Sequence, residues 1–206
     1  MKKKVDEKRK MQKDLPEEEA YTSSMVYGVF RKFAVLSALV IFIWIFCTFL
    51  GRFCLIDGTD MEKTLPEHSL VYVDQMVPKF YGFTRFDVVL YQYIDADNKK
   101  KEAFGRIAGM PGESVQLQDG QLIIDGSKVA LPANKKTHFT AGYAKTAVTL
   151  GEEEYFILAD ADTAQADSRT LDEYGLPVVG PVEEDAFIGV ARWIINPKKK
   201  LFGKVE

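Results

Sequence analysis

The sequence predicts a mainly β protein, with a single N-terminal transmembrane helix followed by an antiparallel β-sheet or barrel domain that carries a small inserted β-region. Three observations lead to this fold class. Residues 33–50 form an almost unbroken apolar run, FAVLSALVIFIWIFCTFL. From Ile56 onward, short segments rich in β-branched and aromatic residues follow one another. Residues 114–131 contain two Asp-Gly pairs between alternating apolar positions, which is typical of β-hairpins.

The start of the chain is dense in charge. The first 32 residues hold nine Lys or Arg and six Asp or Glu, a local excess of plus three. The whole chain carries minus three, so the remainder carries minus six. Because so polar a segment cannot bury a core, we expect residues 1–32 to form a charged tail.

The apolar run has the length of a membrane span. Its eighteen residues, at ~1.5 Å each, extend about 27 Å, close to the thickness of the bilayer core. The excess of Lys and Arg precedes the run, which favours a cytoplasmic N-terminus. We therefore expect a single-pass cell-membrane protein, in which residues 33–51 contact lipid and residues 52–206 form an extracellular domain.

Two other interpretations of this run are a cleaved signal peptide and a buried core helix. A signal peptide has an apolar region of roughly 7–15 residues, followed by small residues at the cleavage site. Here the run ends in Phe49 and Leu50, and Gly51, Arg52 and Phe53 follow it, which is a poor cleavage site. A core helix needs helical neighbours, and nothing else in the chain is helical enough to surround it.

The domain is predicted to be built from strands. Residues 69–74, 86–94, 154–159 and 187–196 have strand composition, and Asp119-Gly120 and Asp125-Gly126 predict two successive hairpin turns. No repeated alternation of strands and helices occurs, so we expect antiparallel pairing.

Several kinds of site are excluded by composition. No basic stripe interleaves with aromatic residues, which argues against a nucleic-acid partner. Cys47 and Cys54 would lie roughly 10 Å apart on a helix, too far for a disulfide. His68 and His138 are distant in sequence and have no accompanying Cys cluster, so we expect no metal site and no cofactor.

Five short segments occur in an informative order after the apolar run. They are DMEKTL (60–65), SLVYVD (69–74), RFDVV (85–89), GRIAGMPGE (105–113) and ADADTAQADSR (159–169). Together they resemble the motifs of the type I signal peptidase family, over roughly residues 33–197. One such motif is weak evidence alone, but five in order after a single span are specific.

The resemblance departs from the family at the two catalytic positions. Met61, Thr64 and Leu65 agree with the family motif Ser-Met-x-Pro-Thr-Leu, but Asp60 stands where the family has its nucleophilic Ser. Gly105 occupies the position of the general-base Lys. A carboxylate has no hydroxyl to attack a peptide bond, and glycine has no group to take a proton. We therefore expect no catalytic residue and no enzymatic activity.

The rest of the resemblance implies a scaffold and a groove. The Asp-Ser-Arg element of the family braces the catalytic region, and the residues here that match it and its surroundings are Asp160, Asp167, Ser168 and Arg169. The family holds its substrate extended against strand edges, a mode that needs neither the Ser nor the Lys. The candidate groove residues are Asp60, Met61, Gly105 and Arg106.

A subgroup with Asp and Gly at these positions accompanies pilus genes in Gram-positive bacteria. Resemblance to it implies a non-proteolytic, chaperone-like factor in sortase-dependent pilus assembly. The implied partners are pilin subunits or their signal or extended segments, and a sortase.

The alternative function is an active type I signal peptidase with rearranged catalytic residues. Thr59 or Lys101 would then act, or Asp60 would form a carboxylate pair with Asp160 or Asp167.

A sharper hypothesis is that Gly105 leaves room for a partner's Lys, which would pair with Asp60. The favoured alternative is an unused site, or an internal pair between Asp60 and a neighbour such as Arg106.

Overall fold

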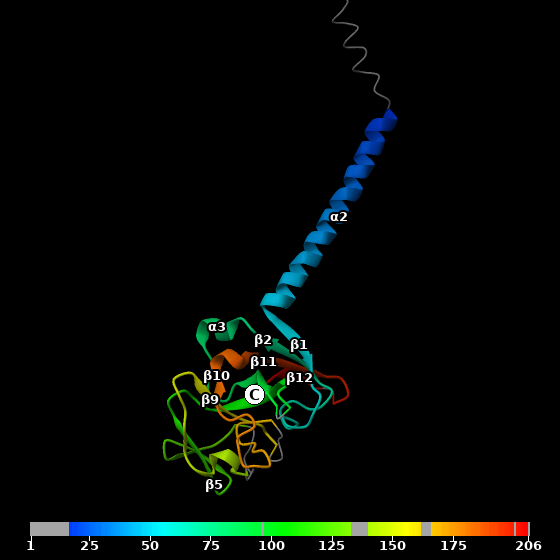
Figure 1. The fold of residues 1–206 in the computed structure, drawn as a ribbon. Coiled ribbons are helices and arrows are strands. Elements are labelled where there is room, and N and C mark those ends of the chain that lie inside the picture. The colour runs from blue at the N-terminus through cyan, green and yellow to red at the C-terminus, as the bar shows by residue number, and fades with distance from the viewer. Residues whose placement is uncertain (1–16, 96, 133–139, 162–165, 200, 206) are drawn as a thin grey trace, which may run out of the picture. The chain divides into compact units, whose positions relative to one another are not determined.

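The computed structural model describes residues 17–95, 97–132, 140–161, 166–199 and 201–205. The chain divides into two compact units, Met1–Cys47 and Thr48–Glu206. Helix α2 (Glu17–Phe49) carries a stretch, Val26–Ile45, that is long and apolar enough to cross a membrane and is not buried (Figure 1). The helix therefore begins well before residue 33, so that residues 17–32, expected to be a charged tail, are helical.

The second unit is built on an eight-stranded antiparallel sheet (Figure 1). The strand order is β1-β2-β11-β3-β4-β9-β10, and β12 pairs with β11. The strands are β1 (Gly51–Leu55), β2 (Leu70–Asp74), β3 (Val88–Ile94), β4 (Lys100–Gly109), β9 (Glu154–Leu158), β10 (Val182–Glu183), β11 (Phe187–Asn196) and β12 (Leu201–Lys204). The short helix α3 (Val77–Tyr81) follows β2, and the 3-10 turn η2 (Glu184–Ala186) precedes β11.

A second, four-stranded sheet is inserted between β4 and β9, in the order β7-β6-β5-β8. Its elements are β5 (Ser114–Gln118), β6 (Gln121–Ile124), β7 (Ser127–Val129), β8 (Val148–Thr149) and the 3-10 turn η1 (Gly142–Lys145). Asp119 and Asp125 have φ values of 52° and 48°, each followed by a glycine with positive φ. This is the backbone of type I′ hairpin turns, so both predicted hairpins are confirmed.

Strand β3 lies at the centre of the main sheet, and both of its faces are buried. Val88 and Leu90 belong to one hydrophobic cluster, while Val89 and Tyr91 belong to another. This two-sided burial explains why the strand reads as a continuous apolar run and not as an alternation. The first cluster also contains Met61 from the loop between β1 and β2, so that this loop packs onto one face of the sheet.

The predicted fold class is confirmed: the chain is mainly β, with antiparallel sheets, one N-terminal apolar helix and an inserted β-region. The strands predicted near residues 69–74, 86–94, 154–159 and 187–196 are present. Strands β1, β4, β8, β10 and β12 were not predicted.

Candidate functional site

The loop that carries Asp60 is fixed to the segment that follows β9. The Asp60 carbonyl accepts a hydrogen bond from the Ala161 N–H at 2.9 Å, and the Met61 Sδ accepts one from the Asp160 N–H at 3.3 Å. Met61 is buried, and Asp60 is half-buried. Backbone and core contacts therefore help to fix the position of residue 60.

Arg106 lies under this loop and joins three segments of the chain. Its guanidinium donates to both carboxylate oxygens of Asp160 at 3.1 Å, to Thr64 Oγ1 at 2.9 Å and to the Phe86 carbonyl at 3.0 Å. Thr64 in turn donates to Asp160. Arg106 is 1% exposed and Asp160 3% exposed. The geometry is bidentate and fully buried, which suits a structural brace.

A second brace forms around Asp167. Its carboxylate accepts from the Arg169 guanidinium at 2.6 and 2.8 Å, and from the Ala159 N–H at 3.0 Å. Arg169 also donates to the Ala161 carbonyl at 2.9 Å, and Ser168 Oγ accepts from the Ile157 N–H at 2.9 Å. All three residues of the Asp-Ser-Arg element are buried.

The position of the general-base Lys is closed by packing. Gly105 pairs with Val89 across the β3–β4 ladder. A Cβ added there would overlap the Ile157 Cγ2 methyl group and lie 3.3 Å from Tyr91 Cε1. Ile157 and Tyr91 are both fully buried, and the Tyr91 hydroxyl donates to the Ala166 carbonyl. The expectation that Gly105 leaves room for an incoming Lys is therefore wrong, because neighbouring side chains fill the space.

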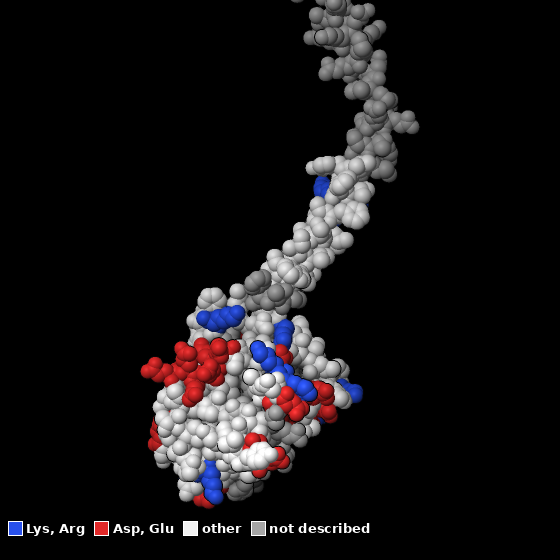
Figure 2. All heavy atoms as spheres, in the orientation of Figure 1, with Lys and Arg blue, Asp and Glu red and all other residues white. Residues whose placement is uncertain are grey.

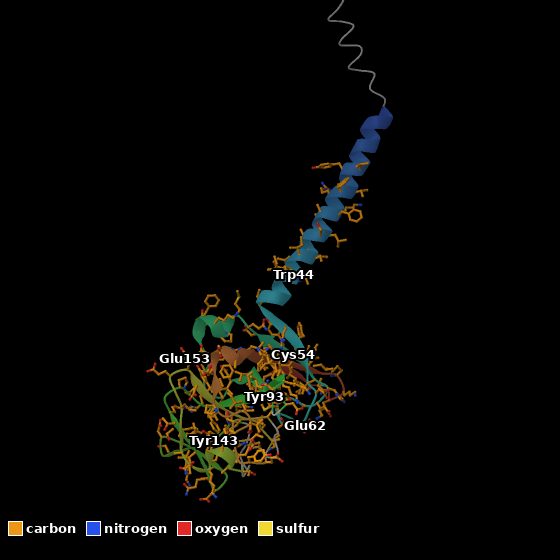
Figure 3. The ribbon with its side chains drawn as sticks, in the orientation of Figure 1. Trp44, Cys54, Glu62, Tyr93, Tyr143 and Glu153 are labelled. Carbon is orange, nitrogen blue, oxygen red and sulfur yellow. The ribbon has the colours of Figure 1, made fainter. Side chains whose placement is uncertain are left out.

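Beside this closed position lies an open pocket of about 680 Å³. It runs from β1 along the Asp60 loop to the facing parts of β3 and β4, and Cys54 and Tyr93 of its lining are labelled in Figure 3. The lining residues are Cys54, Leu55, Ile56, Asp57, Gly58, Thr59, Asp60, Met61, Leu90, Tyr93, Glu102, Ala103, Phe104 and Ala166. Of the four expected groove residues, Asp60 and Met61 are in this lining, whereas Gly105 and Arg106 are not.

Burial raises the pKa of three groups at or next to this pocket. Desolvation raises the pKa of the fully buried Tyr91 phenol well above its ordinary value, and the charges of Asp167 and Asp60 add to the shift. Desolvation also raises the pKa of Tyr93 and of the Cys54 thiol. These groups are therefore neutral near pH 7, and none of them is a ready nucleophile.

Four residues were considered as replacements for the catalytic Ser and Lys of the family, and three of them, Lys101, Asp160 and Asp167, are engaged in ion pairs. Lys101 Nζ lies 2.7 Å from Asp95 Oδ2, and this hydrogen bond raises the pKa of Lys101 further, which keeps it protonated and unable to act as a base. Asp160 and Asp167 are each held by an arginine, which does not suit a carboxylate pair sharing one proton. Thr59 is exposed in a turn at the pocket and has a hydroxyl.

Sequence reasoning missed several residues of this site. Tyr91 and Ile157 close the Gly105 position, and Asp57 and Glu102 add carboxylates to the pocket lining. The apolar composition of β3 and β9 is a signal for burial, but it does not say which side chains meet Gly105. In the part of the chain that the structure describes, no group of three or more His, Cys, Asp or Glu side chains could hold a metal ion.

Comparison with known proteins gives the following matches. A family model described as signal peptidase, peptidase S26, matches residues 29–196. Signal peptidase I T of Bacillus subtilis (strain 168) is 31% identical over 171 residues, covering 80% of this chain and 81% of that protein. Signal peptidase I of Bacillus licheniformis is 31% identical over 150 residues, covering 69% and 75%. A solved signal peptidase I from Enterococcus faecalis V583 is 24% identical and superimposes with a TM-score of 0.38, over 52% of this chain and 95% of that one.

Proposed function

The chain belongs to the signal peptidase family, peptidase S26, and from that premise we propose that it is a membrane-anchored member that binds extended peptide segments without cleaving them. The observation that carries this proposal is the contrast between two neighbouring places. The position of the base is filled by Ile157 and Tyr91, while the pocket beside Asp60 is open. A site that has lost its base but kept its groove can bind without cutting.

The anchor in this proposal is α2, which would cross the membrane once with its N-terminus in the cytoplasm. The apolar stretch Val26–Ile45 supports the crossing. The excess of Lys and Arg in the first 32 residues supports the orientation, because positive charge favours the cytoplasmic side. The second unit would then meet secreted chains as they leave the membrane.

We further propose that the bound segments belong to pilin subunits, and that the protein assists sortase-dependent pilus assembly as a chaperone-like factor. The support for this assignment is the pair of residues Asp60 and Gly105, which resembles the pilus-associated subgroup of the family.

The first test is a cleavage assay. The purified full chain, in detergent, is incubated with a pilin precursor that retains its signal peptide, beside signal peptidase I T of Bacillus subtilis as a working control. We expect the precursor to remain intact with this chain and to co-purify with it. Cleavage at the signal site would overturn the proposal.

The second candidate function is that of an ordinary signal peptidase, which the names of the relatives favour. Thr59 is the hydroxyl nearest in sequence to the nucleophile position, and it lines the pocket. If cleavage occurs, Thr59→Ala and Lys101→Ala identify the rearranged groups, and Lys199→Ala serves as a control that removes a charge outside the pocket lining.

A further inference from the structure

The pocket beside Asp60 lies between two strand edges that are open to a further strand. Strand β1 is the first of the main sheet and, among the strands that the structure describes, pairs with β2 alone. Residues 100–105 of β4 pair with β3, and β9 joins β4 only from Arg106 onward, within the described part of the sheet. Both β1 and β4 contribute to the pocket lining, although three strands separate them in the sheet order.

An ion pair shows how closely these two edges approach. Arg52 Nη2 on β1 lies 2.5 Å from Glu102 Oε2 on β4, and both side chains are partly exposed. The sheet is therefore curled enough for side chains of β1 and β4 to meet beside the pocket that both strands line. Open backbone groups on facing edges are what an extended peptide needs in order to add as a strand.

The charges of the lining narrow down which peptide fits. Three carboxylates belong to it, those of Asp57, Asp60 and Glu102, and no Lys or Arg is among its described residues. Arg52, which is not part of the lining, pairs with one of the three, Glu102. The walls between these carboxylates are apolar, with Leu90 and Phe104 beside Met61.

From this arrangement we infer that the groove selects an extended peptide segment with a Lys or Arg side chain, whose charged end lies among Asp57, Asp60 and Glu102. This inference rests on the proposed peptide-binding function and adds the class of ligand. The methylene stem of such a side chain packs on the apolar walls while its cation reaches the carboxylates. Partial enclosure strengthens the attraction compared with an exposed surface pair.

A second acidic pocket on the same unit provides a matched control. It has a volume of about 530 Å³, and its lining includes Glu153, Glu184 and Asp185. Figure 2 shows acidic side chains gathered on this face, near β9 and β10. None of these three residues lines the Asp60 pocket, so Glu153→Gln removes one negative charge from the same unit without changing the proposed groove.

The experiment measures the binding of fluorescent peptides to the full chain in a nonionic detergent, by anisotropy. Three extended ten-residue peptides differ at one central position, which is Lys, norleucine or Glu. We expect the Lys peptide to bind about tenfold more tightly than the norleucine peptide at low salt, and the Glu peptide to bind most weakly. Raising the salt concentration narrows this difference, because the attraction is electrostatic.

Variants then locate the effect. Asp60→Asn combined with Asp57→Asn brings the affinity for the Lys peptide close to that for the norleucine peptide, whereas Glu153→Gln leaves the ratio unchanged. Lys and norleucine peptides that bind equally well overturn the inference and leave the proposed function standing. If none of the three peptides binds, strand capture itself fails, and the inference fails with it.

Discussion

At the scale of single residues, the neighbours of Gly105 leave no room for a side chain at this position. Ile157 is β-branched and fully buried, so its Cγ2 methyl group cannot turn aside easily when a side chain is placed at residue 105. Tyr91 lies on the other side and is tied by its hydroxyl to the Ala166 carbonyl. The absence of a lysine is thus accompanied by packing that fits glycine.

This packing predicts the effect of the smallest possible change. Gly105→Ala should lower the free energy of unfolding by about 1–3 kcal/mol, the usual cost of overpacking a core. Ile157→Ala alone should cost about 2–5 kcal/mol through the cavity it leaves. In the Ile157→Ala background the Gly105→Ala penalty should largely disappear, because the colliding methyl group is gone.

Urea unfolding of the detergent-solubilised chain, with the two single variants and the double variant, measures this coupling as a double-mutant cycle. Strictly additive penalties would show that Gly105 and Ile157 do not collide.

Tyr91 predicts a pH dependence at the alkaline end. Burial raises its pKa well above that of a free tyrosine, and the unfolded chain releases the same proton near pH ~10. Above that pH the folded state holds a proton that the unfolded state has lost, so the free energy of unfolding falls as pH rises. Tyr155, whose pKa is raised to about 12 by burial and by its hydrogen bond with Glu184, contributes in the same direction.

Tyr91→Phe should therefore flatten the decline of stability between pH 9 and pH 11, although the variant loses about 0.5–1.5 kcal/mol at neutral pH with its hydrogen bond. The double variant Tyr91→Phe with Tyr155→Phe should show an even smaller loss of stability over this pH range. Denaturant midpoints at each pH provide the measurement, and a slope equal to that of the unchanged chain would contradict the assignment.

At the scale of elements, Arg106 connects β4 to the loop that carries Asp60. It reaches Asp160 and Thr64 in one buried network, so that three separate segments depend on one guanidinium. Removing it leaves the Asp160 carboxylate buried without its cation, which typically costs about 3–5 kcal/mol.

Arg106→Ala should therefore lower the free energy of unfolding by that amount. Lys199→Ala is the matched control, since its ion pair with Glu62 has a distance of 2.6 Å but is 52% and 42% exposed. Its loss should cost about 0–1 kcal/mol. Thermal and urea unfolding of both variants test the difference, and similar costs for the two would mean that burial of the Arg106 pair does not matter.

The elements also show how far sequence reasoning reaches. The hairpin turns could be predicted from local sequence. Asp119-Gly120 and Asp125-Gly126 adopt positive φ, a conformation that few other residues adopt easily. Strand β4 was missed because it begins with Lys100, Lys101 and Glu102, whose charge masks a strand that pairs with β3. Strand β1 was missed because it begins at Gly51, directly after the apolar run, so that its apolar residues do not stand out from that run.

The candidate site also has a part that could be predicted from local sequence and a part that depends on the fold. Asp60 and Gly105 could be identified from the flanking motifs, since each lies in a local pattern. The contact of Gly105 with Ile157 could not, because it depends on the pairing of β4 with β9 and on its exact register. The carboxylates of Asp57 and Glu102 come together only through the curl of the main sheet.

At the scale of the whole molecule, charge is distributed unevenly along the chain. The first 32 residues carry plus three and the remainder minus six. A positive N-terminal segment before an apolar stretch favours retention of that end in the cytoplasm. On the outer face, an acidic second unit would attract a cationic peptide electrostatically.

This distribution predicts the topology of the chain in cells. With an epitope tag at each end, protease added to intact spheroplasts should remove the C-terminal tag and leave the N-terminal tag protected. Lysing the spheroplasts with detergent should expose both tags, and a cytoplasmic protein should be digested only then. A protected C-terminal tag would show that the second unit is not on the outer face. The groove could not then meet secreted segments.

The same gel distinguishes an anchor from a cleaved leader. A retained span such as Val26–Ile45 keeps both tags on one band of full length, whereas cleavage after residue 50 would place them on separate bands. We expect a single band, because Phe49, Leu50 and Arg52 make a poor cleavage site. Substituting Lys2, Lys3 and Lys4 with Gln should weaken the preference for this orientation, since positive charge before the span is what sets it.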